Sequence, residues 1–331
     1  MRVPAIVFHG AGGAEVISLG ETEVREPGRG EVQVVIAAAG VNRADVLQRR
    51  GLYPAPPGVP VDVPGLEYSG TVTALGPGAT RWTVGAEVMG ITGGGAMAQR
   101  ITVHERELVP VPRGVALVDA AAIPEVFFTA WDALVLQAAL GPGETVLIHA
   151  AASGVGTAAI QVARAIGARP LATGRQPEKL ARLTALGLTP YEAIHVDGPR
   201  FAAAVAERTH GRGAEVVLDC VGASYFEENI RALCVRGRLV LIGTLGGPAA
   251  GAVPLPMMLG KRVTVIGTVL RARPLEEKIA LAQDVTLRLV PLFERGLVRP
   301  VIDEIMPMAD CAKAHARMEA NANIGKLVLT W

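Results

Sequence analysis

The sequence predicts an α/β protein in which a doubly wound parallel sheet follows a β-rich part and precedes a short β-containing tail. Three observations support this fold class. Short apolar runs punctuated by Pro and Gly extend to about residue 124, strand-like and helix-like segments alternate from about residue 125, and β character returns near the C-terminus. We therefore expect two domains, 1–124 completed by 286–331, and 125–285.

The first part is expected to form a partly open antiparallel barrel. Apolar runs at 32–38 and 70–74 predict strands, and frequent Pro and Gly residues predict the turns between them. Residues 42–50 predict one short helix, which Gly51 would end.

Residues 144–167 organise the second domain. They contain an apolar run typical of a buried parallel strand, a small-residue turn at 150–156 and a helix with one apolar face. Backbone N–H groups and the partial positive charge of a helix N-terminus bind pyrophosphate in this setting. We expect Ser153, Gly154 and Val155 to contact a dinucleotide there; the alternative is a turn that needs small residues only for packing.

Five further strands complete the predicted sheet of six. They are expected at 169–173, 193–196, 215–219, 238–242 and 263–269. Helices are expected at 177–187, 200–209, 224–233, 275–296 and 309–320, and a last strand at 327–330. Doubly wound sheets bind ligands at the carboxyl ends of their strands. The residues there that should line the crevice are Gly154, Val155, Asp219, Cys220, Val221, Gly222, Gly243, Thr244 and Leu245.

Composition narrows the class of partner. The chain has 32 Lys and Arg against 31 Asp and Glu, a formal net charge of +1, and only 4% aromatic residues. This balance argues against nucleic acid and against an anionic membrane as partners. The N-terminus lacks a signal-peptide pattern, and no apolar run reaches membrane-spanning length. The three cysteines are isolated, which favours a reducing compartment, so we expect a cytoplasmic protein.

The segment after the second strand of the predicted sheet indicates the preferred cofactor. An NAD site holds Asp or Glu about twenty residues after the glycine turn. Here the chain reads Thr173-Gly174-Arg175-Gln176, with Lys179 close behind. Two cations without an acid favour the 2′-phosphate of NADPH over the ribose hydroxyl of NADH. Alternatively, Arg175 and Lys179 are solvated surface charges.

Six segments match one known family in their order along the chain. They are VNRADVLQRRGLYPAPPG (41–58), PGLEYSG (64–70), AAIPEVFFTAWDAL (121–134), LIHAAASGVGTAAIQ (147–161), VVLDCVGASYFEENI (216–230) and MEANANIGKLVL (318–329). Together they resemble the zinc-independent, zeta-crystallin-like quinone oxidoreductases of the medium-chain dehydrogenase/reductase superfamily. Within that family the chain is most similar to the stress-inducible, NADPH-dependent branch.

The resemblance implies a GroES-like first domain, a Rossmann domain for NADPH, and a homodimer or homotetramer joined through the strand from Val263 to Val269. It further implies cofactor contacts in both domains, at Asn42, Arg43, Asp45, Tyr53, Thr129, Gly174, Lys179, Asn323 and Lys326 in addition to the glycine-turn and crevice residues named above. Several relatives have a tyrosine after the third strand of the sheet that contacts the 2′-phosphate. This chain departs from them, because it has Val196 there, next to His195.

Zinc ligands are missing from the matching positions. Zinc alcohol dehydrogenases read G-H-E where this chain reads Gly65-Leu66-Glu67, no cysteine precedes Cys220, and the six histidines lack ligand spacing. We therefore expect no metal, and a hydride passed directly between nicotinamide and acceptor.

A polar donor beside the acceptor's oxygen would stabilise the charge that develops there. The candidate catalytic residues are Tyr53 and Asn42 as donors and Asp45 as the group that orients Tyr53 or the ribose. Each also has a purely structural interpretation: Tyr53 as a loop aromatic, Asn42 as a helix cap and Asp45 as a first-turn acid.

The leading hypothesis is an NADPH-dependent, zinc-independent quinone oxidoreductase that acts on a quinone or enone acceptor. The first alternative is an NADPH-dependent enone or enoyl-thioester reductase, in which Arg271 and Arg273 would bind the phosphopantetheine of a carrier. The second alternative is an NADPH-binding protein without catalytic activity.

Overall fold

A computed structural model describes residues 1–251 and 253–331 of the chain. Its contacts divide the chain into two compact units. The first unit comprises Met1–Phe128 and Leu270–Trp331, and the second comprises Thr129–Val269. Residues 270–285, expected in the cofactor domain, therefore belong to the first unit.

Helix α9 (Leu275–Asp284) explains this difference in the boundary. It packs against residues 105–107 of the first unit. The guanidinium of Arg106 donates to both carboxylate oxygens of Glu276 on α9, at 3.0 and 2.8 Å.

The second unit is built on a parallel sheet, which confirms the doubly wound part of the predicted fold. The described strands have the order β10-β9-β8-β11-β12-β13, and all pairs are parallel. Their bounds are β8 (Thr145–Ile148), β9 (Arg169–Gly174), β10 (Ala193–His195), β11 (Ala214–Asp219), β12 (Leu233–Leu241) and β13 (Thr264–Gly267). The chain reverses its winding direction between β8 and β11, the place where Rossmann sheets bind dinucleotides.

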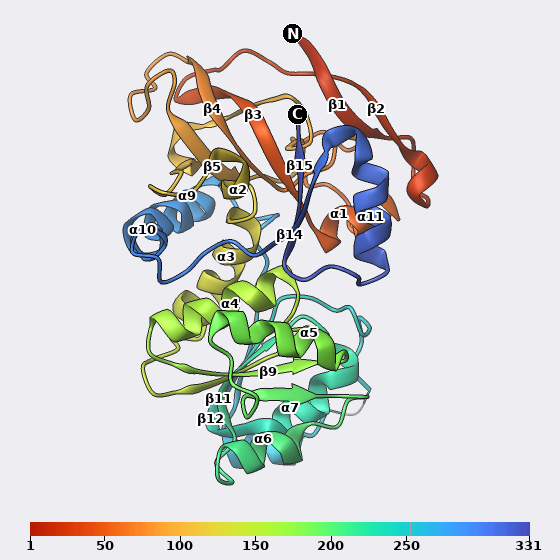
Figure 1. Ribbon diagram of the computed structural model, residues 1–331, viewed down its shortest axis with the longest axis vertical. Coiled ribbons are helices and arrows are strands. Elements are labelled where there is room, and N and C mark those ends of the chain that lie inside the picture. The colour runs from red at the N-terminus through yellow and green to blue at the C-terminus, as the bar shows by residue number, and fades with distance from the viewer. Residues whose placement is uncertain (252) are drawn as a thin grey trace. The chain divides into compact units, whose positions relative to one another are not determined.

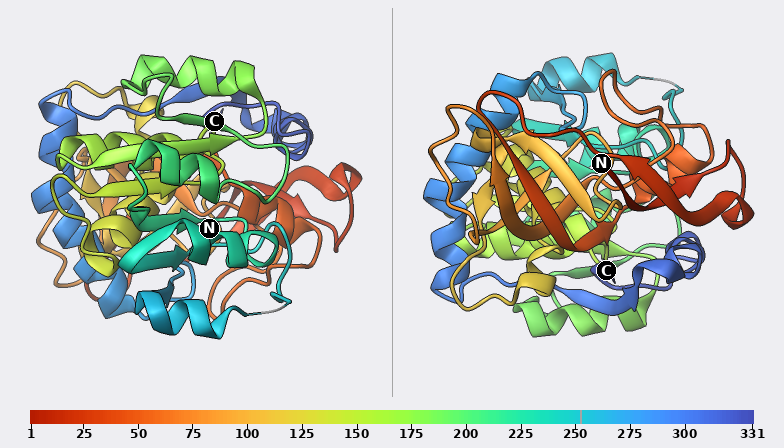
Figure 2. Two further views of the ribbon diagram at one scale, coloured as in Figure 1. Left: turned by 90° about the horizontal axis from the view of Figure 1, so that it is seen from below. Right: turned by 90° about the horizontal axis from the view of Figure 1, so that it is seen from above.

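Helices cover both faces of this sheet (Figures 1 and 2). They are α4 (Gly154–Ala165), α5 (Pro177–Arg182), α6 (Ala202–Arg208), α7 (Phe226–Ala232) and α8 (Leu255–Lys261). Strand β8 has no exposed residue, because a parallel strand between two helical layers is covered on both sides. That is why its sequence is a continuous apolar run rather than an alternating one.

The first unit contains the antiparallel sheet that the sequence predicts. The described strands have the order β14-β15-β3-β4-β5-β7, and β6 also pairs with β3. Their bounds are β3 (Glu31–Val41), β4 (Glu67–Leu75), β5 (Glu87–Ile91), β6 (Arg100–His104), β7 (Val109–Pro110), β14 (Ile302–Pro307) and β15 (Lys326–Thr330). The tail thus returns to the first unit, since β15 pairs antiparallel with β3.

Two features of the first unit were not predicted. Strands β1 (Arg2–Phe8) and β2 (Ile17–Glu23) form a separate antiparallel ribbon, red in the right-hand view of Figure 2. Strand β14 pairs in parallel with β15. The remaining helices are α1 (Arg43–Arg49), α2 (Leu117–Ala120), α3 (Pro124–Trp131), α10 (Val290–Glu294) and α11 (Cys311–Glu319).

The helix expected at 275–296 is not regular. A π-helical segment, Val285–Leu289, separates α9 from α10, where Pro291 cannot donate a backbone hydrogen bond. Every helix among the described residues is too short or too polar to cross a lipid bilayer.

Candidate active site

The turn predicted to hold phosphates joins β8 to α4. Ser153 is the N-cap of α4, and its Oγ accepts the N–H of Gly156 at 3.1 Å. Gly156 has no room for a side chain, since a Cβ would lie 2.5 Å from the carbonyl oxygen of Ala151. The N–H of Ala151 donates to the carbonyl of Thr173 on β9 at 3.0 Å. The N-terminus of a twelve-residue helix, which favours anions, therefore lies at the carboxyl end of β8.

The predicted 2′-phosphate contacts lie at and beyond the end of β9. Gly174 ends the strand, Arg175 follows on the surface, and Lys179 lies half-buried on α5. His195 is bound locally, because its Nε2 lies 3.2 Å from the carbonyl oxygen of Arg175 and 3.2 Å from a carboxylate oxygen of Asp197. This strand end therefore presents two cations, and residues 173–176 contribute no acid.

The loop that follows β11 and the loop that follows β12 are joined by backbone hydrogen bonds. The N–H of Leu245 donates to the carbonyl of Cys220 at 3.2 Å. Gly222 has φ +80°, and a Cβ on it would lie 3.0 Å from the Cα of Thr244. Glycine is needed there because the two backbones approach closely. The predicted crevice residues on these loops are Val221, Gly222, Gly243, Thr244 and Leu245.

A buried polar network fixes the first of these loops; the sequence analysis named its Asp219 as a crevice residue but not its other members, Asn229 and His149. The carboxylate of Asp219, at the end of β11, accepts the N–H groups of Val221 at 2.6 Å and Gly222 at 3.1 Å. Asn229 on α7 donates to Asp219 at 2.9 Å, and its Oδ1 lies 2.7 Å from Nε2 of His149. Burial raises the pKa of Asp219 to about 6 and lowers the pKa of His149 to about 4, so the histidine is neutral at pH 7.

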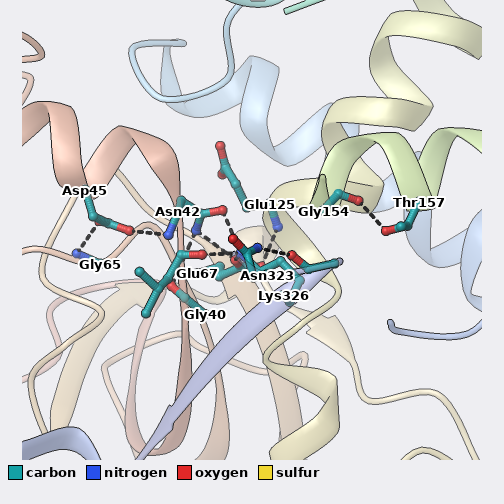
Figure 3. A network of polar contacts seen from close by, with 12 residues as sticks. Gly40, Asn42, Asp45, Gly65, Glu67, Glu125, Gly154, Thr157, Asn323 and Lys326 are labelled. Atoms are coloured by element: carbon teal, nitrogen blue, oxygen red, sulfur yellow. Dashed lines mark hydrogen bonds and ion pairs between the residues drawn. The ribbon is translucent and has the colours of Figure 1, made fainter. Parts of the chain in front are cut away.

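Three strands of the first unit bring a second buried network together (Figure 3). Lys326 begins β15, Asn42 follows β3 and Glu67 begins β4, and these strands are neighbours in the sheet. The Nζ of Lys326 donates to Glu67 at 2.6 Å, to the Oδ1 of Asn42 at 2.7 Å and to the carbonyl of Val41 at 2.8 Å. Lys326 is 3% exposed and Glu67 0% exposed. Glu67 therefore has a lysine as its ion-pair partner.

Asn42 and Asp45 cap helix α1. The N–H of Asn42 donates to Oδ2 of Asp45 at 2.8 Å in a capping box, and the N–H of Gly65 donates to Oδ1 at 3.0 Å. Burial raises the pKa of Asp45 to about 6. Asp45 is 0% exposed, and both oxygens of its carboxylate accept backbone N–H groups. These contacts fit the structural interpretation of Asp45 as a first-turn acid and leave no contact by which it would orient Tyr53. The Nδ2 of Asn42 donates to Glu67 at 2.8 Å, so a bond to an acceptor would have to replace this one.

Tyr53 is held in place by Arg271. The guanidinium of Arg271 lies 4.8 Å from the centre of the Tyr53 ring and donates to the Tyr53 carbonyl at 3.1 Å. It also donates to the carbonyl of Gly93 at 2.7 Å and to Oε1 of Gln48 at 2.5 Å. Arg271 is only 5% exposed, so it is not the surface cation that the enoyl-thioester alternative requires. Burial, and then the charge of Glu125, raise the pKa of the Tyr53 phenol, which keeps its proton at neutral pH.

The remaining predicted contacts lie in both units. Arg43 donates to the carbonyl of Met318 at 2.6 Å and to Oδ1 of Asn321 at 2.8 Å. The Nδ2 of Asn323 donates to the carbonyl of Gly325 at 2.8 Å. Thr129, half-buried on α3, is the first residue of the second unit. Their contacts with a cofactor stay predictions.

Glu125, which the sequence analysis did not single out, is the most strongly perturbed acid of this site. It lies in the first turn of α3, and its N–H donates to Oε2 of Glu67 at 2.8 Å. Burial, and then the charge of Glu67, raise the pKa of Glu125 to about 8. One signal was available: Glu125 is the only charged residue in the run from Ala120 to Trp131.

Two protein families match the chain. Residues 28–113 match the family described as an alcohol dehydrogenase GroES-like domain, and residues 154–284 match the one described as zinc-binding dehydrogenase. Among the described residues, however, no three His, Cys, Asp or Glu side chains are grouped so that they could hold a metal ion.

Individual relatives agree with the family matches. The chain is 36% identical to a quinone oxidoreductase of Pseudomonas aeruginosa over 98% of each chain. It is similar to the solved structure of a Pseudomonas syringae quinone oxidoreductase, with 32% identity, a TM-score of 0.87 and coverage of 99% of this chain and 100% of that one. The JamJ enoyl reductase is similar too, with 28% identity, a TM-score of 0.88 and coverage of 100% and 99%. The fold, the glycine turn and these matches together show that the chain belongs to the quinone oxidoreductase family of the medium-chain dehydrogenase/reductase superfamily.

Proposed function

We propose that this oxidoreductase is a cytoplasmic, NADPH-dependent quinone oxidoreductase that works without zinc. The observation that carries the proposal is the pair Arg175 and Lys179 at the end of β9, where an NAD-selective site would hold a carboxylate. The quinone acceptor is supported by the Pseudomonas aeruginosa relative, which carries that name. The three cysteines are free thiols, in keeping with a reducing compartment.

The second unit has the features that a dinucleotide needs. Glycine at 156 lets the turn pack closely, because a Cβ there would lie 2.5 Å from the carbonyl oxygen of Ala151, and the helix end beside it favours an anion. Ser153, Gly154 and Val155 would hold the pyrophosphate, and Arg175 and Lys179 the 2′-phosphate. When bound, NADPH supplies the hydride.

In the first unit, Tyr53 is the group that would meet the acceptor. Its phenol stays protonated at neutral pH and can donate a hydrogen bond to the acceptor's oxygen as negative charge develops there. Arg271 fixes the ring by stacking on it and fixes the loop by binding the Tyr53 carbonyl. Asn42 and Asp45 hold the helix that precedes this loop.

Cofactor selectivity can be tested by calorimetry. Arg175→Ala should weaken NADPH binding about 10- to 100-fold, because a charge-assisted hydrogen bond contributes about 1.5–3 kcal/mol, and should leave NADH binding nearly unchanged. Gly156→Ala is the matched control, since it disturbs the pyrophosphate turn and should weaken both cofactors alike. Tighter binding of NADH than of NADPH by the wild type would contradict the NADPH assignment.

The acceptor can be tested by comparing a benzoquinone with a crotonyl thioester. The similarity to an enoyl reductase structure keeps the thioester reaction as the second candidate. Faster turnover of the quinone supports the proposal, and faster turnover of the thioester supports the alternative. Tight NADPH binding without reduction of either acceptor would support a non-catalytic NADPH-binding protein.

We further propose a homodimer that pairs through β13, the end strand of the described parallel sheet. Val265 on β13 is 38% exposed, and Leu255 and Leu259 on α8 are 60% and 77% exposed. A strand with one open edge beside exposed apolar side chains favours pairing with a second copy. Val265→Asp should shift the molar mass measured by light scattering from dimer to monomer.

A further inference from the structure

A polar hollow lies at the amino ends of four neighbouring strands of the parallel sheet, β8, β11, β12 and β13. Its volume is about 430 Å³, and its lining residues are Glu144, Glu215, Cys234, Val235, Arg236, Arg238, Arg262 and Thr264. All strand pairs in this sheet are parallel, so its amino ends and its carboxyl ends lie at opposite edges. The glycine turn and the loops after β11 and β12 are at the carboxyl edge. The hollow is therefore separate from the proposed cofactor site.

The two acids that line this hollow already have donors within the fold. Nη2 of Arg238 donates to both carboxylate oxygens of Glu144 at 2.7 Å, and Oε2 of Glu144 also accepts the N–H of Gly141 at 2.9 Å. Oε2 of Glu215 accepts the N–H of Thr145 at 2.7 Å. Because three arginines and two glutamates line the hollow, it has a surplus of one positive charge.

Arg236 and Arg262 hold the unused hydrogen-bond donors of the hollow. Both are exposed, and within the described part of the chain neither side chain forms a hydrogen bond or an ion pair. Both also have a left-handed backbone, with φ +63° and +53°, which is unfavourable for a residue with a side chain. Arg262 is the C-cap of α8, at a helix end where glycine is common. Backbone strain of this kind is typical of residues whose side chains have a function.

We propose that this hollow binds a phosphate group, either as free phosphate or as the monoester of a small metabolite. A phosphate group carries close to two negative charges at neutral pH and several acceptor oxygens. A guanidinium binds such oxygens through two parallel N–H bonds, and Arg236 and Arg262 supply two guanidinium groups. A single carboxylate would engage only one of them. The proposal goes beyond quinone reduction and does not depend on it.

Calorimetric titration with inorganic phosphate tests the proposal. The wild type is first saturated with NADPH, which fills the cofactor site, and it should then still bind phosphate at one site per chain. Arg236→Gly and Arg262→Gly should each weaken this binding about 10- to 100-fold, because charge-assisted hydrogen bonds are lost. Neither variant should lower Tm, since glycine adopts the left-handed backbone without strain and the arginine side chains lack partners among the described residues. The matched control is Arg200→Gly, at an exposed arginine of the same unit that does not line the hollow, and it should bind phosphate like the wild type.

Further titrations identify the ligand. Tighter binding of ribose 5-phosphate than of inorganic phosphate supports a monoester, and equal affinity supports free phosphate. Absence of phosphate binding by the wild type overturns the proposal, as does equal affinity in Arg236→Gly and Arg200→Gly. Tighter binding of succinate than of either phosphate compound overturns the choice of phosphate. The same titrations without NADPH keep this test independent of the proposed function, because the difference between wild type and Arg236→Gly still isolates the hollow.

Discussion

Replacing Lys326 by methionine should destabilise the first unit strongly, because it strands a buried carboxylate. Lys326 and Glu67 are 3% and 0% exposed, and Nζ and Oε1 are 2.6 Å apart. Removing one partner of such a pair costs about 3–5 kcal/mol, since the remaining charge is buried without compensation. Asn42 and Val41 would also lose their bonds to Nζ. For a unit of this size the loss corresponds to a fall in Tm of about 6–20 °C.

A double-mutant cycle followed by thermal unfolding isolates the pair. Glu67→Gln together with Lys326→Met removes both charges, so the double variant should be more stable than Lys326→Met alone. The control is Lys313→Met: the side chain of Lys313 is 74% exposed and pairs with Asp310 at 2.8 Å on the surface, so its loss should cost less than about 1 kcal/mol. If Lys326→Met and Lys313→Met lower Tm equally, or if the double variant is simply additive, the argument from burial is wrong.

Three further outcomes follow from the same structure. Asn229→Ala should lower stability by about 1–3 kcal/mol and weaken NADPH binding in calorimetry, because Asp219 and His149 lose a buried partner and the loop after β11 is released; unchanged binding would contradict the role of this network. Between about pH 4.5 and 8 the folded state binds more protons at Glu125 than the unfolded state does, so this acid lowers stability progressively as pH rises through that window. The free energy of unfolding of Glu125→Gln should therefore exceed that of the wild type by about 2–5 kcal/mol above pH 8 and equal it near pH 4. Chemical denaturation at the two pH values measures both differences. Gly156→Ala should lower Tm as well as cofactor affinity, because its Cβ would lie 2.5 Å from a carbonyl oxygen of the preceding turn; a Tm equal to the wild type would show that the turn can relax.

Elements with a strong local signal were predictable. The apolar run of β8 and the start of α5 at Pro177 both follow from residues close in sequence, and the structure has each of them. The long helix expected at 275–296 was wrong in its middle, where the chain forms a π-helical segment before Pro291. The β1–β2 ribbon was missed, because proline interrupts β1 and polar residues and a glycine interrupt β2.

The sequence by itself determined the fold class, the glycine turn and the lack of an acid at residues 173–176, because each depends on residues that are neighbours along the chain. Only the tertiary structure decided which side chains share a site. Lys326, Asn42 and Glu67 meet because β15, β3 and β4 are adjacent in one sheet. The raised pKa of Glu125 and the buried position of Arg271 have the same origin. Desolvation and the charge of distant residues set them, and no local pattern of residues encodes either quantity.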